Sequence, residues 1–379
     1  MPEVAAVGAQ ASVGNASTGP AVASATRLYF PTLDGLRFFA FLLVFIHHLP
    51  TAPNRLLRVV DEYGWVGVHL FLFLSAFLLT SILRKELEQT GTISIVHFYV
   101  RRGLRIWPLY FAFCFAMLAF QVFWRTDMPV DWGRFIGLLF FFDNVLTGWQ
   151  GYNEMPYVPH LWTISLEEQF YLFLPILLLK WLGEPRRLLQ ALVVLWLLFL
   201  SVRVLSVLLG AEHPFIWTSV FSADSLLLGT ALGAVRLPAA LSNRWLPFLM
   251  VPGAVLLVSG VFLAPVYAIG WHQVVLYSLV ALGAACVVVA GLLSPAYSFL
   301  GHQPLAYLGK ISYGLYIFHL IGIALGGKVA QALGSDSWWT LALLSLACTL
   351  ILSIASYELY EKHFLRLKRR FESVHSRQP

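Results

Sequence analysis

Long apolar runs separated by short polar stretches occupy the chain from about residue 33 to residue 359. A helix that crosses a bilayer needs about 20 predominantly apolar residues, and most of the runs have that length. The pattern delimits runs at 33–50, 65–83, 104–124, 134–146, 161–181, 187–209, 215–235, 246–268, 272–293, 304–326 and 338–359. It predicts an all-α, polytopic membrane helix bundle.

Basic residues between the runs predict the orientation of the bundle, because Lys and Arg are enriched in cytoplasmic loops. They gather at 84–105, after the fifth and seventh runs, and at 362–370. All these basic stretches lie on the cytoplasmic side only if residues 125–160 stay on the outer side as one excursion. The short run 134–146 is then re-entrant or interfacial. The sequence thus predicts about ten transmembrane helices, one such short helix and two cytoplasmic termini.

Composition excludes a soluble protein. Of the 379 residues 59% are hydrophobic and 12% charged, which leaves too little polar surface to face water. The net charge of +6 comes largely from basic clusters between runs, so no basic soluble domain is expected to bind nucleic acid. The three cysteines lie in apolar runs without motif spacing, and neither a disulfide framework nor a metal site is predicted.

Three segments are predicted along the chain. Residues 1–26 are rich in Ala, Gly, Ser and Val, which is typical of a disordered tail rather than a cleaved signal peptide. Residues 27–365 form one transmembrane domain, and residues 366–379 a basic cytoplasmic tail.

The first run carries titratable groups, which are costly in hydrocarbon and mark a functional-site hypothesis. Arg37 and His48 are eleven residues apart, so on a helix they lie about 20° apart in azimuth and about 16 Å apart along the axis. His47 points about 80° away from Arg37 by the same geometry. Arg37 and His48 are therefore predicted to share a face that His47 does not.

A second cluster opens the third run. Arg101 and Arg105 are four residues apart and are expected on one helix face, with Arg102 beside them. Guanidinium groups bind phosphates through forked donors. Arginines that flank a span are also common topological anchors, and for this cluster alone that interpretation is preferred.

Glu167 and Glu168 are adjacent within an apolar run and about 100° apart on a helix, so at most one faces a given site. A structural ion pair and a catalytic role are equally compatible with them. Arg203 and Asp224, on consecutive spans, predict a buried pair between helices. A lone histidine such as His319 is more often a packing residue.

The predicted depths in the membrane divide these polar residues into an inner group and an outer group. At about 1.5 Å of rise per residue, His48 and Glu167 fall at similar depth toward the outer side, whereas Arg37 and the arginines near residue 101 lie at the inner end. His69, Arg203 and His319 fall in the outer half. An anionic donor is thus expected to enter from the cytoplasm, and the reaction is expected to take place toward the outer side.

These residues together resemble the acyltransferase-3 family of integral-membrane bacterial O-acyltransferases. The resemblance runs in order from about residue 29 to residue 370. Its motifs are Leu33–Arg37 with His48, Leu74–Leu78, Phe98–Pro108, His160–Tyr171, Asp224 with Gly229, Ile311–Tyr313 with His319, and Ser356–Tyr357 with Glu361. Two positions depart from the family pattern: His69 stands where members usually carry Asp, and Ala76 where they carry Gly.

The resemblance implies a bacterial cytoplasmic-membrane enzyme that transfers an acyl group from acyl-CoA, usually acetyl-CoA, to a hydroxyl group. The expected acceptor is a sugar of an exopolysaccharide, a lipopolysaccharide or a lipid-linked oligosaccharide; a peptidoglycan sugar and a macrolide-like molecule stay open. With few residues after the last run, the chain is expected to lack the extracytoplasmic hydrolase-like domain fused to some relatives. A bound cofactor is not expected, since acyl-CoA is a substrate.

The resemblance also assigns roles. His48 is the expected general base, because neutral imidazole accepts a proton near physiological pH, and Glu167 or Glu168 would orient it or stabilise its charged form. Direct transfer and an acyl-histidine intermediate both remain open. The expected binding residues for CoA phosphates are Arg37, Arg101, Arg102 and Arg105. The expected supporting residues are Asp34, His69, Ser75, Arg203, Asp224, Tyr316 and His319.

An anion transporter or channel is the alternative from another class. It would use the same arginines and histidines and would move its solute without consuming acyl-CoA. The sequence lacks the paired repeats and the corresponding broken helices that favour such a transporter.

Overall fold

The computed structural model describes residues 28–210, 223–235, 246–258 and 270–374, and its regular elements within these ranges are helices with no strand. The predicted all-α class is confirmed. The α-helices are α1 (Pro31–His47), α2 (Arg55–Tyr63), α3 (Val66–Thr90), α4 (Ile95–Trp124), α5 (Trp132–Leu139), α6 (Asp143–Gln150), α7 (Trp162–Trp181), α8 (Pro185–Leu208), α10 (Asp224–Ala234), α11 (Met250–Leu257), α13 (Trp271–Leu293), α14 (Gln303–Lys310), α15 (Ser312–Ala332), α16 (Trp338–Ser356) and α17 (Lys362–Lys368). Short 3-10 turns lie at Pro159–Leu161, Leu246–Leu249, Pro295–Gly301 and Arg369–Phe371, and a π-helical turn at Tyr357–Glu361.

The multi-pass bundle is also confirmed. Among the described residues, the helical stretches long and apolar enough to cross a membrane are Val66–Thr90, Ile95–Trp124, Pro159–Trp181, Pro185–Leu208, Val274–Leu293, Ser312–Ala332 and Trp338–Phe371. Helix α1 is shorter, with 17 residues. The predicted spans 215–235 and 246–268 fall partly outside the described ranges, so the total of about ten spans stays a prediction.

The short run 134–146 does not cross the bundle. It breaks after α5, where Phe141 has a φ of 54° and the Phe142 amide donates to the Gly137 carbonyl at 2.7 Å. The two helices on either side, α5 and α6, have eight residues each, about 12 Å of rise, which is too short to span hydrocarbon. The run therefore does not form one transmembrane helix; its re-entrant or interfacial placement and its side of the membrane stay predictions.

An ion pair holds the α5–α6 excursion together. Arg134 donates to Asp143 Oδ1 at 3.0 Å, to the Thr147 hydroxyl at 2.8 Å and to the Gly151 carbonyl at 2.8 Å. Asn153 also donates to Asp143 Oδ1, at 3.1 Å. Burial raises the pKa of the Asp143 carboxyl, and the Arg134 guanidinium opposes that rise.

Two predicted boundaries are wrong. The basic stretch 84–105 is not a loop, because α3 extends to Thr90 and α4 begins at Ile95, so the arginines near residue 101 lie on a 30-residue helix. The run 304–326 is not one span, because α14 ends at Lys310 and α15 begins at Ser312. Helix α14 packs against α1, where a Cβ on Gly309 would overlap the Asp34 backbone, and hydrophobicity alone does not distinguish such a packed segment from a membrane span.

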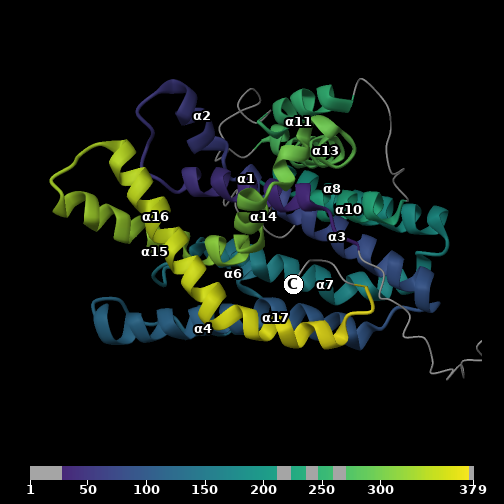
Figure 1. The fold of residues 1–379 in the computed structure, drawn as a ribbon, viewed down its shortest axis with the longest axis horizontal. Helices are drawn as coiled ribbons and strands as arrows, with labels where there is room; N and C mark the ends of the chain where they lie inside the picture. The colour runs from purple at the N-terminus through teal and green to yellow at the C-terminus, as the bar shows by residue number, and fades with distance from the viewer. Residues whose placement is uncertain (1–27, 211–222, 236–245, 259–269, 375–379) are drawn as a thin grey trace, which may run out of the picture.

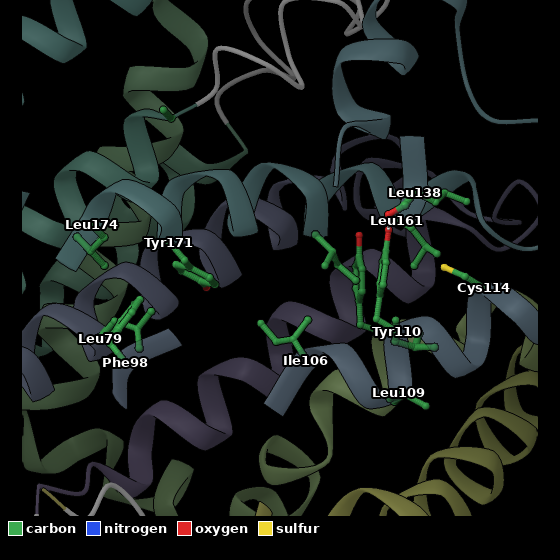
Figure 2. Close-up of a cluster of buried hydrophobic side chains, with 14 of the residues drawn as sticks. Leu79, Phe98, Ile106, Leu109, Tyr110, Cys114, Leu138, Leu161, Tyr171 and Leu174 are labelled. Carbon is green, nitrogen blue, oxygen red and sulfur yellow. Dashed lines mark hydrogen bonds between the residues drawn. The ribbon is translucent and has the colours of Figure 1, made fainter. Parts of the chain in front are cut away.

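The largest apolar core lies where α3, α4, α5 and α7 meet (Figure 2). Leu79, Phe98, Tyr110 and Leu174 are all almost fully buried there. The Tyr110 hydroxyl donates to the Leu138 carbonyl at 3.0 Å, which satisfies its polar end and joins α4 to α5.

Helix α10 packs closely against α3 through small residues. A Cβ on Gly229 would lie 2.5 Å from the Phe73 carbonyl oxygen, and one on Gly233 would lie 2.6 Å from the Phe77 carbonyl oxygen. Small residues four apart let two backbones approach, and this supplies the contact that apolar surface alone does not provide in lipid. Figure 1 shows α10 and α3 lying along one another.

Candidate active site

A cavity inside the bundle collects the polar residues of five helices. It holds about 770 Å³ of empty space, part of it open to the surroundings. Its polar lining comprises Arg37 of α1, Ser75 of α3, Arg102 and Arg105 of α4, Thr163, Glu167 and Tyr171 of α7, and Ser312, Tyr313 and Tyr316 of α15. Segments more than 270 residues apart in the chain thus meet around one space.

The arginines of α4 divide between this cavity and an ion pair. Arg102 and Arg105, three residues apart, line the cavity. Arg101 instead donates to Glu86 Oε2 at 2.9 Å and to the Phe371 carbonyl at 2.8 Å, and both charged side chains are buried. Arg101 and Arg105 both lie on α4, four residues apart, but of the two only Arg105 lines the cavity, because α3 presents Glu86 to Arg101.

Arg37 is held at the cavity wall by the first turn of its own helix. One Arg37 nitrogen lies 3.5 Å from Asp34 Oδ1, and the Tyr29 hydroxyl donates to Asp34 Oδ2 at 3.2 Å. The close approach of Gly309 to the Asp34 backbone fixes this turn against α14. Asp34, expected as a supporting residue, thus contacts Arg37.

The two adjacent glutamates separate as the helical geometry predicts. Glu167 lines the cavity, and the hydroxyl groups of Ser75 and Tyr171 lie within reach of its carboxyl group. Glu168 turns toward α4, where its Oε2 accepts a hydrogen bond from Trp107 Nε1 at 2.9 Å. Only Glu167 therefore faces the space that Arg37 and Arg102 share.

Beyond the cavity lies a cluster of three histidines from three parts of the chain. The His48 and His319 ring centroids lie 4.8 Å apart, and those of His160 and His319 lie 4.6 Å apart. His47 turns the other way, with its Nδ1 against the Asp61 carbonyl. The predicted difference in facing between His47 and His48 is confirmed.

The hydrogen bonds of the cluster select one tautomer. His48 Nδ1 lies 2.8 Å from the Val44 carbonyl, and His319 Nδ1 lies 2.6 Å from the Tyr316 carbonyl. A carbonyl only accepts, so each Nδ1 carries the hydrogen and each Nε2 is left as an acceptor; this assignment follows from the hydrogen bonds. His319 Nε2 and both His160 ring nitrogens are buried with no hydrogen-bond partner among the described residues.

Tyr316 separates the cavity from the histidines. It lines the cavity, and its ring centroid lies 5.1 Å from that of His160 and 5.6 Å from that of His319. Its hydroxyl lies 2.7 Å from Thr163 Oγ1 and donates to the His160 carbonyl at 3.0 Å. One side chain therefore contacts both parts of the site.

The expected contact between a glutamate and His48 is not what orients that imidazole. The Val44 carbonyl holds its Nδ1, whereas Glu167 lies among the residues that line the cavity. The equal depth expected for His48 and Glu167 stays a prediction. His160 occupies the place beside the other histidines and was missing from the predicted site. It precedes Glu167 by seven residues, two helical turns, and that spacing signals a shared face.

His69 belongs to a different polar cluster. Its Nδ1 lies 3.3 Å from the Ser225 hydroxyl, and its ring packs against Trp65 and Tyr277 at 5.4 and 5.5 Å. The Asp224–Arg203 pair lies close to it. His69, expected as a supporting residue, thus contacts Ser225, Trp65 and Tyr277.

The predicted pair between Arg203 and Asp224 is confirmed. Two Arg203 nitrogens contact the Asp224 carboxylate at 2.7 and 3.1 Å, and both residues are buried. Trp196 Nε1 and the Ser278 hydroxyl donate to the same carboxylate at 2.9 and 2.7 Å. The pair thus joins α8, α10 and α13 and lies outside the cavity lining.

A metal ion has no evident set of ligands here. Within the described part of the chain, no three His, Cys, Asp or Glu side chains are arranged to hold one. The three clustered histidine rings pack edge to face instead, at interplanar angles of 66° and 71°.

Comparison with known proteins places these features in context. An acyltransferase domain model matches residues 30–358. The chain is 26% identical over 363 residues to the peptidoglycan O-acetyltransferase OatA of Listeria monocytogenes, covering 89% of this chain and 56% of that protein. It is 27% identical over 311 residues to the O-acetyltransferase OatA of Staphylococcus aureus, covering 77% of this chain and 50% of that protein.

A third relative, the putative peptidoglycan O-acetyltransferase YrhL of Bacillus subtilis, is 30% identical over 360 residues, covering 88% of this chain and 54% of that protein. The chain thus spans about half the length of the relatives that it matches. No solved structure matches the chain.

Proposed function

The chain belongs to the acyltransferase family whose domain model covers residues 30–358, and from that membership we propose that it is a membrane O-acetyltransferase. It transfers an acetyl group from acetyl-CoA to a hydroxyl group of an envelope glycan. The observation that carries this proposal is the placement of an arginine-lined cavity directly behind the tyrosine that contacts the histidine cluster.

The arginine end receives the donor. Arg37, Arg102 and Arg105 line the cavity, and guanidinium groups engage phosphate oxygens through paired donors. Along α4, Arg105 precedes Phe113 by eight residues, which is about 12 Å of rise. The Phe113 ring lies 6.5 Å from that of His160. A donor with phosphates at one end and a thioester at the other fits this separation of charge and reaction, and it enters from the cytoplasm.

His48 acts as the general base. With hydrogen on Nδ1, its Nε2 takes the proton of the acceptor hydroxyl as the oxygen attacks the thioester carbonyl carbon. The carbon–sulfur bond breaks, and the imidazolium returns the proton to the departing CoA thiolate. Tyr316 swings aside to let the thioester reach this group, and direct transfer needs no acyl-enzyme.

The acceptor is a sugar of peptidoglycan. The Listeria and Bacillus relatives are named for peptidoglycan, which favours it over the exopolysaccharide and lipopolysaccharide sugars expected from the sequence. The acceptor meets His48 from the outer side of the bacterial cytoplasmic membrane, while both termini stay in the cytoplasm.

The test compares neighbouring histidines in membranes of equal protein abundance. Labelled acetyl-CoA is supplied inside vesicles, and ester-linked label on peptidoglycan, exported polysaccharide and lipopolysaccharide is measured together with free CoA. His48→Ala is expected to lose activity by about 10²- to 10⁴-fold, the usual contribution of a general base, whereas His47→Ala retains it.

Full transfer by His48→Ala would refute the assignment of the base. Label on another glycan would reassign the acceptor. Uptake of an anion without release of CoA would show the transporter instead and overturn the proposed function.

A further inference from the structure

The segment after α16 is docked along α4. Figure 1 shows α16 continuing into α17, which lies beside α4. The Tyr360 hydroxyl donates to the Pro108 carbonyl at 3.3 Å. At the other end of the contact, Arg101 donates to the Phe371 carbonyl at 2.8 Å, and the Phe371 ring lies 5.7 Å from that of His97. The described part of the predicted tail, residues 366–374, thus packs against α4.

This docking builds a second, smaller cavity beside the first. It comprises about 300 Å³ of empty space, part of it open to the surroundings, and its polar lining is Arg101, Arg102, Lys368 and Glu372. Its remaining lining is apolar, from α3, α4 and Val374. Arg102 lines both cavities, so the two spaces share one guanidinium as their common wall.

The polar groups of the smaller cavity suit an anion. Lys368 Nζ lies 2.8 Å from Glu372 Oε1, and the two side chains are only 12% and 8% exposed. Lys368 is also close enough to Arg102 and Arg105 for their charges to act on it. Arg102 Nε is buried with no hydrogen-bond partner among the described residues, which leaves a donor for an incoming oxygen. Arg101 is already matched by Glu86.

We propose that Lys368 is a phosphate-binding residue of the donor site and that Glu372 occupies the phosphate position until the donor displaces it. The inference rests on the proposed function and deepens it. The phosphates of acyl-CoA take the smaller cavity between Lys368 and Arg102, and the thioester arm passes Arg102 into the larger cavity toward Tyr316. The family motifs in the sequence contain no residue from this segment beyond Glu361.

An anionic lipid headgroup carries the same phosphate chemistry, so the experiment separates the two sources. Binding of CoA, dephospho-CoA and pantetheine is measured by calorimetry on the full chain, in nanodiscs of neutral lipid and in nanodiscs with phosphatidylglycerol. The variants are Lys368→Ala, Lys368→Arg and Glu372→Gln. The matched control is Lys362→Ala, on the same helix, whose ammonium pairs with Glu358 at 2.9 Å.

Lys368→Ala is expected to weaken CoA binding by about ten- to a hundredfold, as for a lost hydrogen bond to a charged group, and to leave pantetheine binding unchanged. Lys368→Arg restores most of the CoA affinity. Glu372→Gln tightens CoA binding, because it removes the competing carboxylate. Lys362→Ala binds CoA as the unaltered chain does.

Equal CoA affinity of Lys368→Ala and the unaltered chain would overturn the inference while leaving the proposed function intact. An effect of Lys368→Ala only in phosphatidylglycerol nanodiscs would assign the residue to lipid and also overturn it. Absence of CoA binding by the unaltered chain would instead refute the acyl-CoA donor and the proposed function with it.

Discussion

The arginine-lined cavity and the histidine cluster satisfy their polar groups in opposite ways. Around the cavity, arginines form ion pairs with carboxylates: Arg37 contacts Asp34, and at the edge of the cavity Arg101 contacts Glu86. In the cluster, His48 and His319 contact backbone carbonyls, and the described residues show no carboxylate bonded to either ring. A carbonyl orients an imidazole without adding charge, whereas a carboxylate stabilises a cation.

The difference shows how one bundle can hold two kinds of chemistry. Ion-paired arginines in a confined space retain charge and favour an anionic ligand. Imidazoles held only by carbonyls keep an open nitrogen that can take a proton and release it again. Tyr316, which lines the cavity and contacts His319, stands between the two groups, and under the proposed function it is the boundary that the thioester passes. Separate variants should therefore change the binding of the donor and the transfer step independently.

The largest effect on stability is expected from Glu86→Ala. It leaves Arg101 buried without its carboxylate, and such a broken pair typically costs about 3–5 kcal/mol. A marked loss of thermal stability in detergent should follow, measured as the melting temperature. The double variant Glu86→Met, Arg101→Met should recover most of that stability and still bind CoA. Loss of CoA binding in the stable double variant would mean that Arg101 itself binds the donor, so that Arg101 and Arg102 would not differ in role.

Local sequence patterns predict those features that depend on one helix at a time. The facing of Arg37, His47 and His48, the divergence of Glu167 from Glu168 and the interruption of the run 134–146 all follow from helical geometry or charge.

What the sequence could not show depends on which helices meet. Arg101 is absent from the lining of the larger cavity because α3 presents Glu86 to it. His69 contacts Ser225 because α10 packs on α3. Lys368 lines the same cavity as Arg102 because α17 packs along α4. These contacts join segments that are far apart in the sequence. Hydrophobic periodicity records that a face is buried without specifying its partner.

Arg102→Ala tests whether the cavity affects donor binding without affecting the transfer step. Arg102 lines both cavities, so its loss should weaken CoA binding by about ten- to a hundredfold. The transfer rate at saturating donor should change far less, because the histidines are untouched. The measurement is the KM for acetyl-CoA and the kcat for transfer, with Lys180→Ala as a basic control at the end of α7. A fall in kcat with unchanged KM would place Arg102 with the reacting groups instead.

Tyr316→Phe is expected to have the smallest effect and to probe the boundary itself. It removes the hydroxyl that bonds to Thr163 and to the His160 carbonyl but keeps the ring between the cavity and the histidines. One neutral hydrogen bond contributes about 0.5–1.5 kcal/mol, so stability should fall by no more than that. If these bonds hold the tyrosine closed, the variant opens more readily, and hydrolysis of acetyl-CoA without acceptor should rise while CoA affinity stays constant. Release of CoA is measured in the absence of glycan, with Tyr313→Phe, another cavity-lining tyrosine of α15, as the control. An unchanged rate of hydrolysis together with unchanged transfer would mean that the hydroxyl does not restrain the boundary, and that the shape of the ring alone separates the two regions.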